Sequence, residues 1–351
     1  MIPHSAGLIK GQAAGRWLHI FNALTPELER AVLKPGRHIG CPIHGGKDGF
    51  KLFRDAGYSG GGICNTCGAK ADGFALLMWL RGWSFPDTLS AVADVLGISN
   101  DPGHSTPIVV PEPLLNQTKS VANDDRINRV FRTVWRQSKS LHHPDASPVR
   151  RYLRFRGLDD AIPDYPTLRF HPAMQYRDED GQIVGHYPAL LALLENSQGV
   201  VTLHRTYLTR DGRKALVDSP RKMMPAPSDK KIAGSAIRLG NPGRVLCVTE
   251  GIETALAVIE ATGMVTWPLL SATMMASFLI PTGVEKLVIW SDLDRSLAGT
   301  LAATKLAGLA KAQGVEAVVC EPKGVVPAEA KSIDWLDVLN QRGPNAFAFR
   351  S

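Results

Sequence analysis

Residues 245–253 read V-L-C-V-T-E-G-I-E, and residues 287–294 read L-V-I-W-S-D-L-D. Each is a short apolar run, typical of a buried strand, that ends in acidic residues. Helical patterns follow both runs, so strands and helices alternate from residue 244 onward. Repeated strand–helix units predict a mostly parallel sheet with helices on both faces. We therefore expect an α/β domain over residues 244–351.

Three acids follow these strands directly: Glu250, Asp292 and Asp294. Ligands of parallel α/β sheets bind beyond the carboxyl ends of the strands, so the three side chains should converge there. Clustered carboxylates are unfavourable unless cations neutralise them, and ligand sets made only of oxygen suit Mg²⁺ or Mn²⁺. We expect these acids to be catalytic and to hold a divalent cation for phosphate chemistry.

Three further acids are candidate ligands of the same cation. Glu253 lies in the first turn of the helix that follows Glu250, and Asp334 and Asp337 lie in K-S-I-D-W-L-D. An alternative for Asp334 and Asp337 is that they only favour the N-terminus of the last helix. The sequence leaves both interpretations open.

A second ligand set lies near the N-terminus. Cys41 and His44 form C-P-I-H, nineteen residues intervene, and Cys64 and Cys67 form C-N-T-C. Thiolate and imidazole are the ligands that zinc prefers, and each pair places two ligands on one tight turn. Four protein ligands leave no position for water, so we predict one structural zinc ion per chain rather than a catalytic one.

The zinc ligands lie in a short, Gly-rich segment, 37–69, that is predicted to form strand, tight turn and strand. Two helical segments are expected before it, 11–24 and 25–33, with Thr25 as the N-cap of the second. Two more helices are expected over 71–97, with Ser84 as a cap and Gly97 as a stop. These elements predict a zinc-binding domain over 1–98.

Residues 99–122 contain four prolines and many small polar residues, which indicates a semi-extended linker. The middle of the chain, 123–243, begins with a basic helical pattern and continues as α+β, with a hairpin signal at 210–212. The whole chain is thus predicted to be multidomain: a zinc ribbon with helices, a basic α+β middle, and the parallel-sheet α/β domain.

Charge is unevenly distributed along the 351 residues, whose net charge is +7. Residues 124–156 carry nine Lys/Arg against three acids, and 204–244 carry ten against three. Residues 245–340 reverse the balance, with six basic residues against eleven acids. A cationic middle beside an acidic domain suggests a polyanion track that leads to a metal site, although exposed basic residues can also merely solvate a surface. The residues expected to contact template or nucleotide are Arg151, Arg154, Arg205, Arg221 and Lys222.

Composition bounds the cellular setting. Hydrophobic residues make up 44% of the chain, and no stretch approaches the length of an apolar membrane span. The N-terminus lacks the pattern of a secretory signal, so a cytoplasmic location is expected. Cys247 and Cys320 lie in apolar runs and are predicted to be buried core residues.

These motifs together resemble a known family. C-P-I-H…C-N-T-C, followed by the helical segment 71–97, resembles the zinc-binding domain of bacterial and plasmid or phage DNA primases. V-T-E-G-I-E-T-A-L-A through S-D-L-D-R-S-L-A-G looks like the Toprim domain of plasmid- and phage-type primases. The resemblance covers 37–97 and 244–340 well, and the middle less specifically, through R-R-Y-L-R-F-R-G-L and P-R-K-M-M.

The resemblance implies metal-dependent synthesis of RNA primers on single-stranded DNA, in replication of a mobile element. It implies ribonucleoside triphosphates as substrates and a separate replicative helicase as partner. By it, the three acids after the strands bind catalytic metal, and the Cys/His set binds zinc. The loop D-L-D-R-S-L-A-G is longer than the common D-x-D-x-A-G form, so the helix after it should start later.

Two other functions use the same features. A Toprim nuclease or topoisomerase would cleave nucleic acid with these acids, although all six tyrosines precede the Toprim segment. A non-catalytic single-strand-binding replication accessory protein is the alternative that is not an enzyme. The sequence has no G-x4-G-K-[ST] phosphate loop, so the chain is not expected to unwind DNA by itself.

Overall fold

The computed structural model forms two compact units, Met1–Leu114 and Leu115–Ser351, which are described separately. The predicted linker lies largely outside the described residues, but its last part, 117–122, is helical. None of the described helices combines the length and apolar character needed to cross a membrane. The described residues are 6–98, 117–158, 164–178, 181–295, 297–327, 329–330 and 332–347.

The first unit is a small antiparallel sheet packed against helices. Its strands pair in the order β1-β2-β3-β4. The strands are β1 (Ile39–Cys41), β2 (Gly45–Leu52), β3 (Gly62–Cys64) and β4 (Gly68–Lys70). The helices are α1 (Ala6–Ala13), α2 (Trp17–Leu24), η1 (Pro26–Leu28), α3 (Glu29–Leu33), α4 (Ala56–Ser59), α5 (Gly73–Arg81) and α6 (Phe85–Leu96).

One apolar core joins this sheet to its helices. Phe50 and Leu52 of β2 are fully buried and belong to the same cluster as Trp17, Phe21 and Phe74. The ring of Trp17 meets that of Phe74 edge-on, with 4.8 Å between centroids. The zinc ribbon is therefore one face of a helical core rather than a separate miniature fold.

The N-terminal helices differ from the predicted ones. The segment 11–24 is two helices, because Gly15 takes a positive φ of 82° between them. Thr25 does not cap the following helix through its side chain; its hydroxyl donates to the carbonyl of Phe21 at 2.7 Å instead. The predicted cap Ser84 and stop Gly97 are confirmed, with Ser84 and Asp87 forming a capping box.

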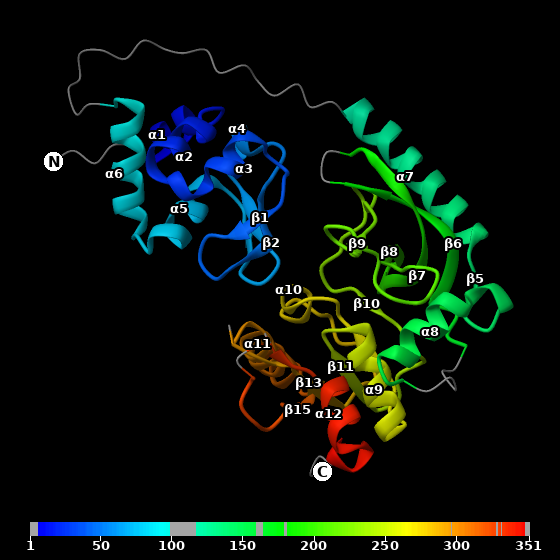
Figure 1. The fold of residues 1–351 in the computed structure, drawn as a ribbon. Helices are drawn as coiled ribbons and strands as arrows, with labels where there is room; N and C mark the ends of the chain where they lie inside the picture. Colours follow the sequence, from blue (N-terminus) through cyan, green and yellow to red (C-terminus); the bar gives the residue numbers. More distant parts are fainter. Residues whose placement is uncertain are drawn as a thin grey trace. The chain divides into compact units, whose positions relative to one another are not determined.

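The second unit begins with an antiparallel sheet in the order β5-β6-β7-β8-β9, with β10 paired to β7. The central strand β7 is buried on both faces, so its residues alternate between two clusters. Helix α7 covers one face (Figure 1), and α8 packs on the other. The elements are α7 (Gln117–Gln137), β5 (Lys139–Ser140), η2 (Pro144–Ala146), α8 (Ser147–Phe155), β6 (Leu168–Arg177), β7 (Ile183–Asn196), β8 (Gly199–Tyr207), β9 (Arg221–Met223) and β10 (Ala236–Ile237).

The predicted hairpin at 210–212 is a tight turn. The backbone N–H of Thr209 donates to the carbonyl of Arg213 at 2.8 Å, and Leu208 forms an isolated bridge with Lys214. Residues 213–217 do not continue as the expected strand. The turn packs on α8 instead, so closely that a side chain on Gly212 would meet Arg151.

The parallel sheet predicted over the C-terminal third is confirmed, with strand order β12-β11-β13-β15. Alternate strand residues face opposite sides: Cys247 and Val288 pack with α9 and α12, whereas Leu246 and Leu287 pack with α10 and α11. A short antiparallel pair, β14 with β16, was not predicted. The elements are β11 (Val245–Thr249), α9 (Ile252–Thr262), β12 (Thr266–Pro268), α10 (Ala272–Met275), β13 (Lys286–Trp290), β14 (Leu293–Asp294), α11 (Ala298–Ala312), β15 (Glu316–Cys320), β16 (Ser332–Ile333), α12 (Trp335–Arg342) and η3 (Pro344–Phe347).

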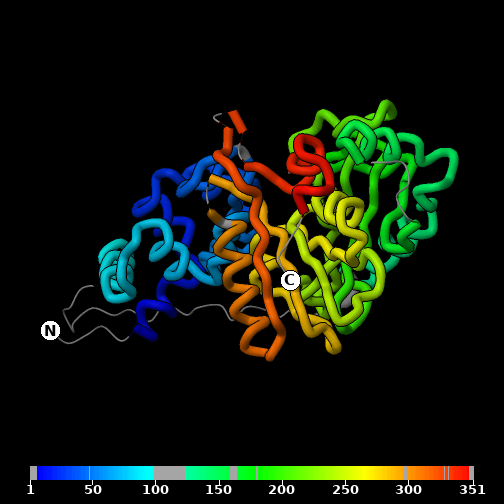
Figure 2. Tube along the Cα trace, turned by 90° about the horizontal axis from the view of Figure 1, so that it is seen from below, coloured from blue at the N-terminus to red at the C-terminus, as the bar shows by residue number. Residues whose placement is uncertain are grey.

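The two sheets of the second unit share a core. Tyr152 and Leu153 of α8 lie in one cluster with Leu256 of α9 and Leu336 of α12. Figures 1 and 2 show α12 and η3 beside α9. The rings of Trp290, Trp335 and Phe347 meet in edge-on or tilted contacts in the same core. This shared core fixes β11 and β13, which carry the predicted catalytic acids, relative to α8.

Candidate metal centres

The four predicted zinc ligands lie at the ends of two hairpin turns. Cys41 ends β1 and pairs with Gly45, and Cys64 ends β3 and pairs with Gly68. The second ligand of each pair, His44 or Cys67, lies within the turn. Each turn then closes on a glycine with positive φ, 74° at Gly45 and 81° at Gly68. Such backbone geometry turns both ligands of a pair to the same side.

The ligand atoms of these four residues all lie within 4.8 Å of one another. The imidazole Nε2 of His44 is 3.1 Å from the sulfur of Cys64. Burial raises the pKa of the Cys41 thiol, and burial together with the neighbouring thiols raises the pKa of Cys67 to about 12. Burial and mutual repulsion make it unfavourable to ionise these thiols without a cation. A cation that binds thiolate would offset this repulsion. Three sulfurs and one imidazole are a tetrahedral zinc set.

The predicted catalytic acids follow two adjacent parallel strands that end at the same position in the sheet. Thr249, the last residue of β11, pairs in parallel register with Trp290, the last residue of β13. Glu250 and Asp292 therefore leave the sheet at one edge, as the strand pattern predicted. The indole N–H of Trp335 donates to the carbonyl of Ser291 at 3.2 Å and ties α12 to this edge.

The carboxylates of this edge disfavour each other's ionised form. Burial and the charges of Glu250, Asp334, Asp294 and Asp337 raise the pKa of Asp292 to about 8. Burial and Asp294 also raise the pKa of Glu250, against the opposing charge of Arg221. The Oδ1 atom of Asp292 is buried and makes no hydrogen bond within the described residues. An unpaired buried oxygen among repelling carboxylates fits a divalent cation.

The three acids do not form a ready ligand group in the structure. In the part of the chain that it describes, the Cys/His set is the one group of three or more potential ligand residues placed to hold a metal ion. Asp294 is engaged as a helix cap: its Oδ2 accepts from the backbone N–H of Gly299 at 3.0 Å, in the first turn of α11. That helix begins at Ala298, after the longer loop, and a delay relative to the common form stays a prediction.

Asp334 and Asp337 form a reciprocal capping box at the start of α12. The N–H of Asp337 donates to Asp334 at 2.9 Å, and the N–H of Asp334 donates to Asp337 at 3.1 Å. Their capping role is thus present in the structure, and both also contribute to the raised pKa of Asp292. A role for either as an outer metal ligand stays a prediction.

Glu253 is held by protein partners. The residue is only 5% exposed, and its carboxylate accepts a hydrogen bond from the Tyr152 hydroxyl and lies 3.4 Å from the guanidinium of Arg221. Burial would raise its pKa, but Arg221 and Tyr152 overcome this effect and lower it to about 2. Glu253 therefore joins α9 to α8 and β9. The sequence did not indicate this pairing, and the only signal for Tyr152 was its place on the apolar face of α8.

Replacing Glu253 with Gln should destabilise the second unit by about 2–3 kcal/mol, because a buried ionic acceptor is lost beside Arg221. A depressed pKa stabilises the fold above the unfolded value, about 4.3, and that contribution is lost as pH falls towards 2. The difference in melting temperature between wild type and variant should therefore be full at pH 7 and shrink below pH 4. Tyr152→Phe, which keeps the ion pair, should lose only about 1 kcal/mol. Equal losses in both variants would contradict this assignment.

The five predicted template-binding residues lie in different surroundings. Arg151 and Arg154 are exposed on α8. Lys222 donates to the carbonyl of Arg177 at 2.8 Å and lies over the ring of Tyr176. Arg205 donates to the carbonyl of Met223 at 2.9 Å, within the sheet, where burial lowers its pKa. The structure thus places Arg205 in a buried structural contact, whereas Arg151 and Arg154 are exposed, and Arg151 also donates to the carbonyl of Arg210 at 3.1 Å.

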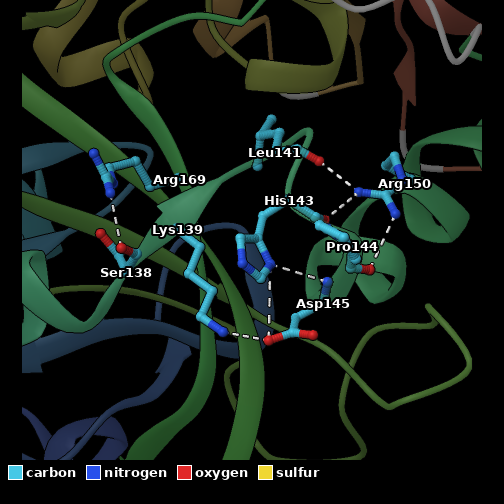
Figure 3. A network of polar contacts seen from close by, with 8 residues as sticks. All are labelled: Ser138, Lys139, Leu141, His143, Pro144, Asp145, Arg150 and Arg169. Atoms are coloured by element: carbon cyan, nitrogen blue, oxygen red, sulfur yellow. Dashed lines mark hydrogen bonds and ion pairs between the residues drawn. The ribbon is translucent and has the colours of Figure 1, made fainter.

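The run R-R-Y-L-R also contains an arginine with a structural role. Arg150 donates to the carbonyls of Leu141, His143 and Pro144, at 2.7, 2.8 and 3.2 Å (Figure 3). Arg169 donates to the carbonyl of Ser138 at 2.7 Å in the same network. These bonds hold the loop before α8. Arginines in this run therefore have two roles: Arg150 anchors the loop, and Arg151 and Arg154 give the surface positive charge.

Comparison with known families assigns both metal centres to domains. Residues 36–74 match the zinc-binding domain of primase-helicase, and residues 245–345 match the Toprim domain. Residues 125–234 match a domain of unknown function (DUF7146). The chain thus contains a primase-type zinc-binding domain and a Toprim domain, which confirms the resemblance and the predicted fold class. No curated protein matches the sequence significantly.

The chain also matches solved primase structures at low identity. The Aquifex aeolicus primase, with its zinc-binding and RNA polymerase domains, is 14% identical, with a TM-score of 0.42 over 93% of this chain and 83% of that one. The primase fragment of the bacteriophage T7 primase-helicase is 16% identical, with a TM-score of 0.37 over 88% and 95%. A DnaG primase catalytic domain bound to single-stranded DNA is 14% identical, with a TM-score of 0.44 over 66% and 80%.

Proposed function

We propose that this protein is a DNA primase that makes short RNA primers on single-stranded DNA, in the replication of a plasmid, phage or integrated element. The observation that carries the proposal is the edge of the parallel sheet. There Glu250 and Asp292 leave adjacent strands, and the buried Oδ1 of Asp292 has no partner among the described residues. The matches to a primase-helicase zinc-binding domain and a Toprim domain add support.

In this proposal Glu250, Asp292 and Asp294 hold Mg²⁺ or Mn²⁺. When bound, such a cation stabilises the charge of the transferring phosphate and of the leaving pyrophosphate. The residues themselves supply negative charge at one edge of a rigid sheet. The cap that Asp294 provides to α11 would couple the site to that helix, and Glu253 with Arg221 would fix α9 beside it. Asp334 and Asp337 are proposed as an outer acidic set.

The basic residues are proposed to carry template and nucleotide. Arg151 and Arg154 project from α8, whose buried face packs in the same core as α9 of the Toprim domain. Arg221 contacts Glu253, three residues after Glu250, and Lys222 is next to it in β9. Phosphates of a single strand or a triphosphate would be attracted to this set. A separate replicative helicase is proposed to open the duplex.

Primer synthesis from labelled ribonucleotides on single-stranded circular DNA tests the proposal. The expected result is a ladder of short RNA products that depends on template, Mg²⁺ and ribonucleoside triphosphates. Degradation of the template without products would favour a Toprim nuclease. Template binding with neither reaction would favour a non-catalytic accessory protein, and either result would overturn the primase proposal.

A further inference from the structure

A cavity of about 620 Å³ lies in the first unit, and its lining ends at Gly40, next to the zinc ligand Cys41. Its walls come from η1 and α3 on one side, and from the turn into β1 on the other. Half of this lining precedes residue 36, where the match to the zinc-binding domain begins. The volume falls in the range of small-ligand sites.

The cavity is lined by positive charge. Arg30, Lys34 and Arg37 lie on it at spacings of four and three residues, and the one acid in the lining is Glu27. The carboxylate of Glu27 is paired with Arg81 at 3.0 Å. The net charge of the lining therefore favours an anion.

Its apolar part is fixed by the fold. Ile39 and Gly40 of β1 line it, and a side chain on Gly40 would come within 2.4 Å of the carbonyl oxygen of Gly46. This close approach holds β1 against the start of β2. Leu33, which also lines the cavity, is 78% exposed. The cavity thus offers cations and an apolar surface on a rigid strand.

We propose that this cavity binds a phosphate ester attached to a flat apolar group, that is, a nucleotide. Guanidinium groups form paired hydrogen bonds to phosphate, and Arg30 and Arg37 would supply them with Lys34 as a point charge. Leu33 and Ile39 would contact the base. The nucleotide could be a free nucleoside triphosphate or part of a strand, which have this chemistry in common. The site does not depend on the proposed primase activity.

Photolabelling with 8-azido-ATP tests the site in the zinc-loaded full chain. The label should map by mass spectrometry to the peptides that contain residues 27–40. Arg30→Glu should weaken labelling about tenfold, whereas Arg30→Lys should retain most of it. Arg30 is exposed, so neither change disturbs the core. Arg16→Glu is the matched control, because Arg16 is exposed in the same unit but does not line the cavity.

Competition separates the two sources of nucleotide. Displacement of the label by ATP and pyrophosphate would identify a free nucleotide, and displacement by oligo(dT) alone would identify a strand. Either result supports the site. No label in residues 27–40, or equal labelling of the wild type and a zinc-containing Arg30→Glu variant, would overturn it. Label at Arg221 or Lys222 would report on the proposed catalytic site, so the two proposals can fail separately.

Discussion

Asp292→Ala should abolish primer synthesis while the protein stays folded and still binds single-stranded DNA. Asp292 is central to the acidic edge: its carboxylate interacts with those of Glu250 and Asp294, and its Oδ1 is buried without a described partner. A metal-held phosphate is worth several kcal/mol of transition-state stabilisation, so we expect a loss of about a thousandfold or more. Gel analysis of labelled primers measures this loss.

The same substitution should raise stability at alkaline pH when Mg²⁺ is left out. The pKa of Asp292 rises from about 3.9 in the unfolded chain to about 8 in the fold. A raised pKa means that the fold favours the protonated carboxyl group, so this contribution to stability is full below about pH 4 and is lost as pH rises to 8. Asp292→Ala should therefore melt higher than wild type at pH 8.5 and show little difference at pH 4.5.

Glu316→Ala is the matched control, because it removes an exposed acid from the same sheet, paired with Lys286 at 3.0 Å. It should leave synthesis intact and should not raise the melting temperature at pH 8.5. Full primer synthesis by folded Asp292→Ala would show that the chemistry lies elsewhere.

The second large effect concerns zinc. Cys64→Ser should release the ion, which we expect at about one per chain in purified protein. Structural zinc sites contribute about 10–16 kcal/mol to folding in zinc-finger peptides. Because Cys41 and Cys64 lie in the core that also holds Trp17 and Phe50, unfolding should extend from residues 37–69 into the helices of the first unit. The second unit should keep its own melting transition.

Elemental analysis and tryptophan fluorescence measure these outcomes. Cys320→Ser serves as the control, since Cys320 lies in β15 of the second unit and is not a ligand. That variant should keep its zinc and both transitions. Native, unchelated protein without zinc would contradict the prediction, as would a first unit that melts normally after Cys64→Ser.

The sequence predicted the C-terminal sheet well because its signals are local. Apolar runs of strand length, each followed by a helical pattern, leave few alternatives for residues 244–340, and the acids at the strand ends follow from topology. The zinc ligands were equally accessible, since two paired spacings define the site. Where a single residue decides the local structure, prediction was weaker: the positive φ of Gly15 split one helix, and Thr25 bonded backwards to Phe21.

Contacts between distant segments could not be read from the sequence. Glu253 was a candidate metal ligand, and in the structure Tyr152, about one hundred residues earlier, and Arg221 bind it. Arg205 was expected to contact the template or nucleotide. In the structure its guanidinium donates to the carbonyl of Met223, within its own sheet. Charge pattern identifies which residues are ionic, and only the fold decides which partner each one meets.

The core shared by α8, α9 and α12 has a consequence for how such genes can recombine. A crossover between the antiparallel and parallel sheets would join Tyr152 of one parent to Glu253 of another, and Leu153 to a foreign Leu336. Each side chain would then pack against a residue from a different parent, with which it was not selected to fit. The two sheets should therefore be inherited together, as one unit of descent.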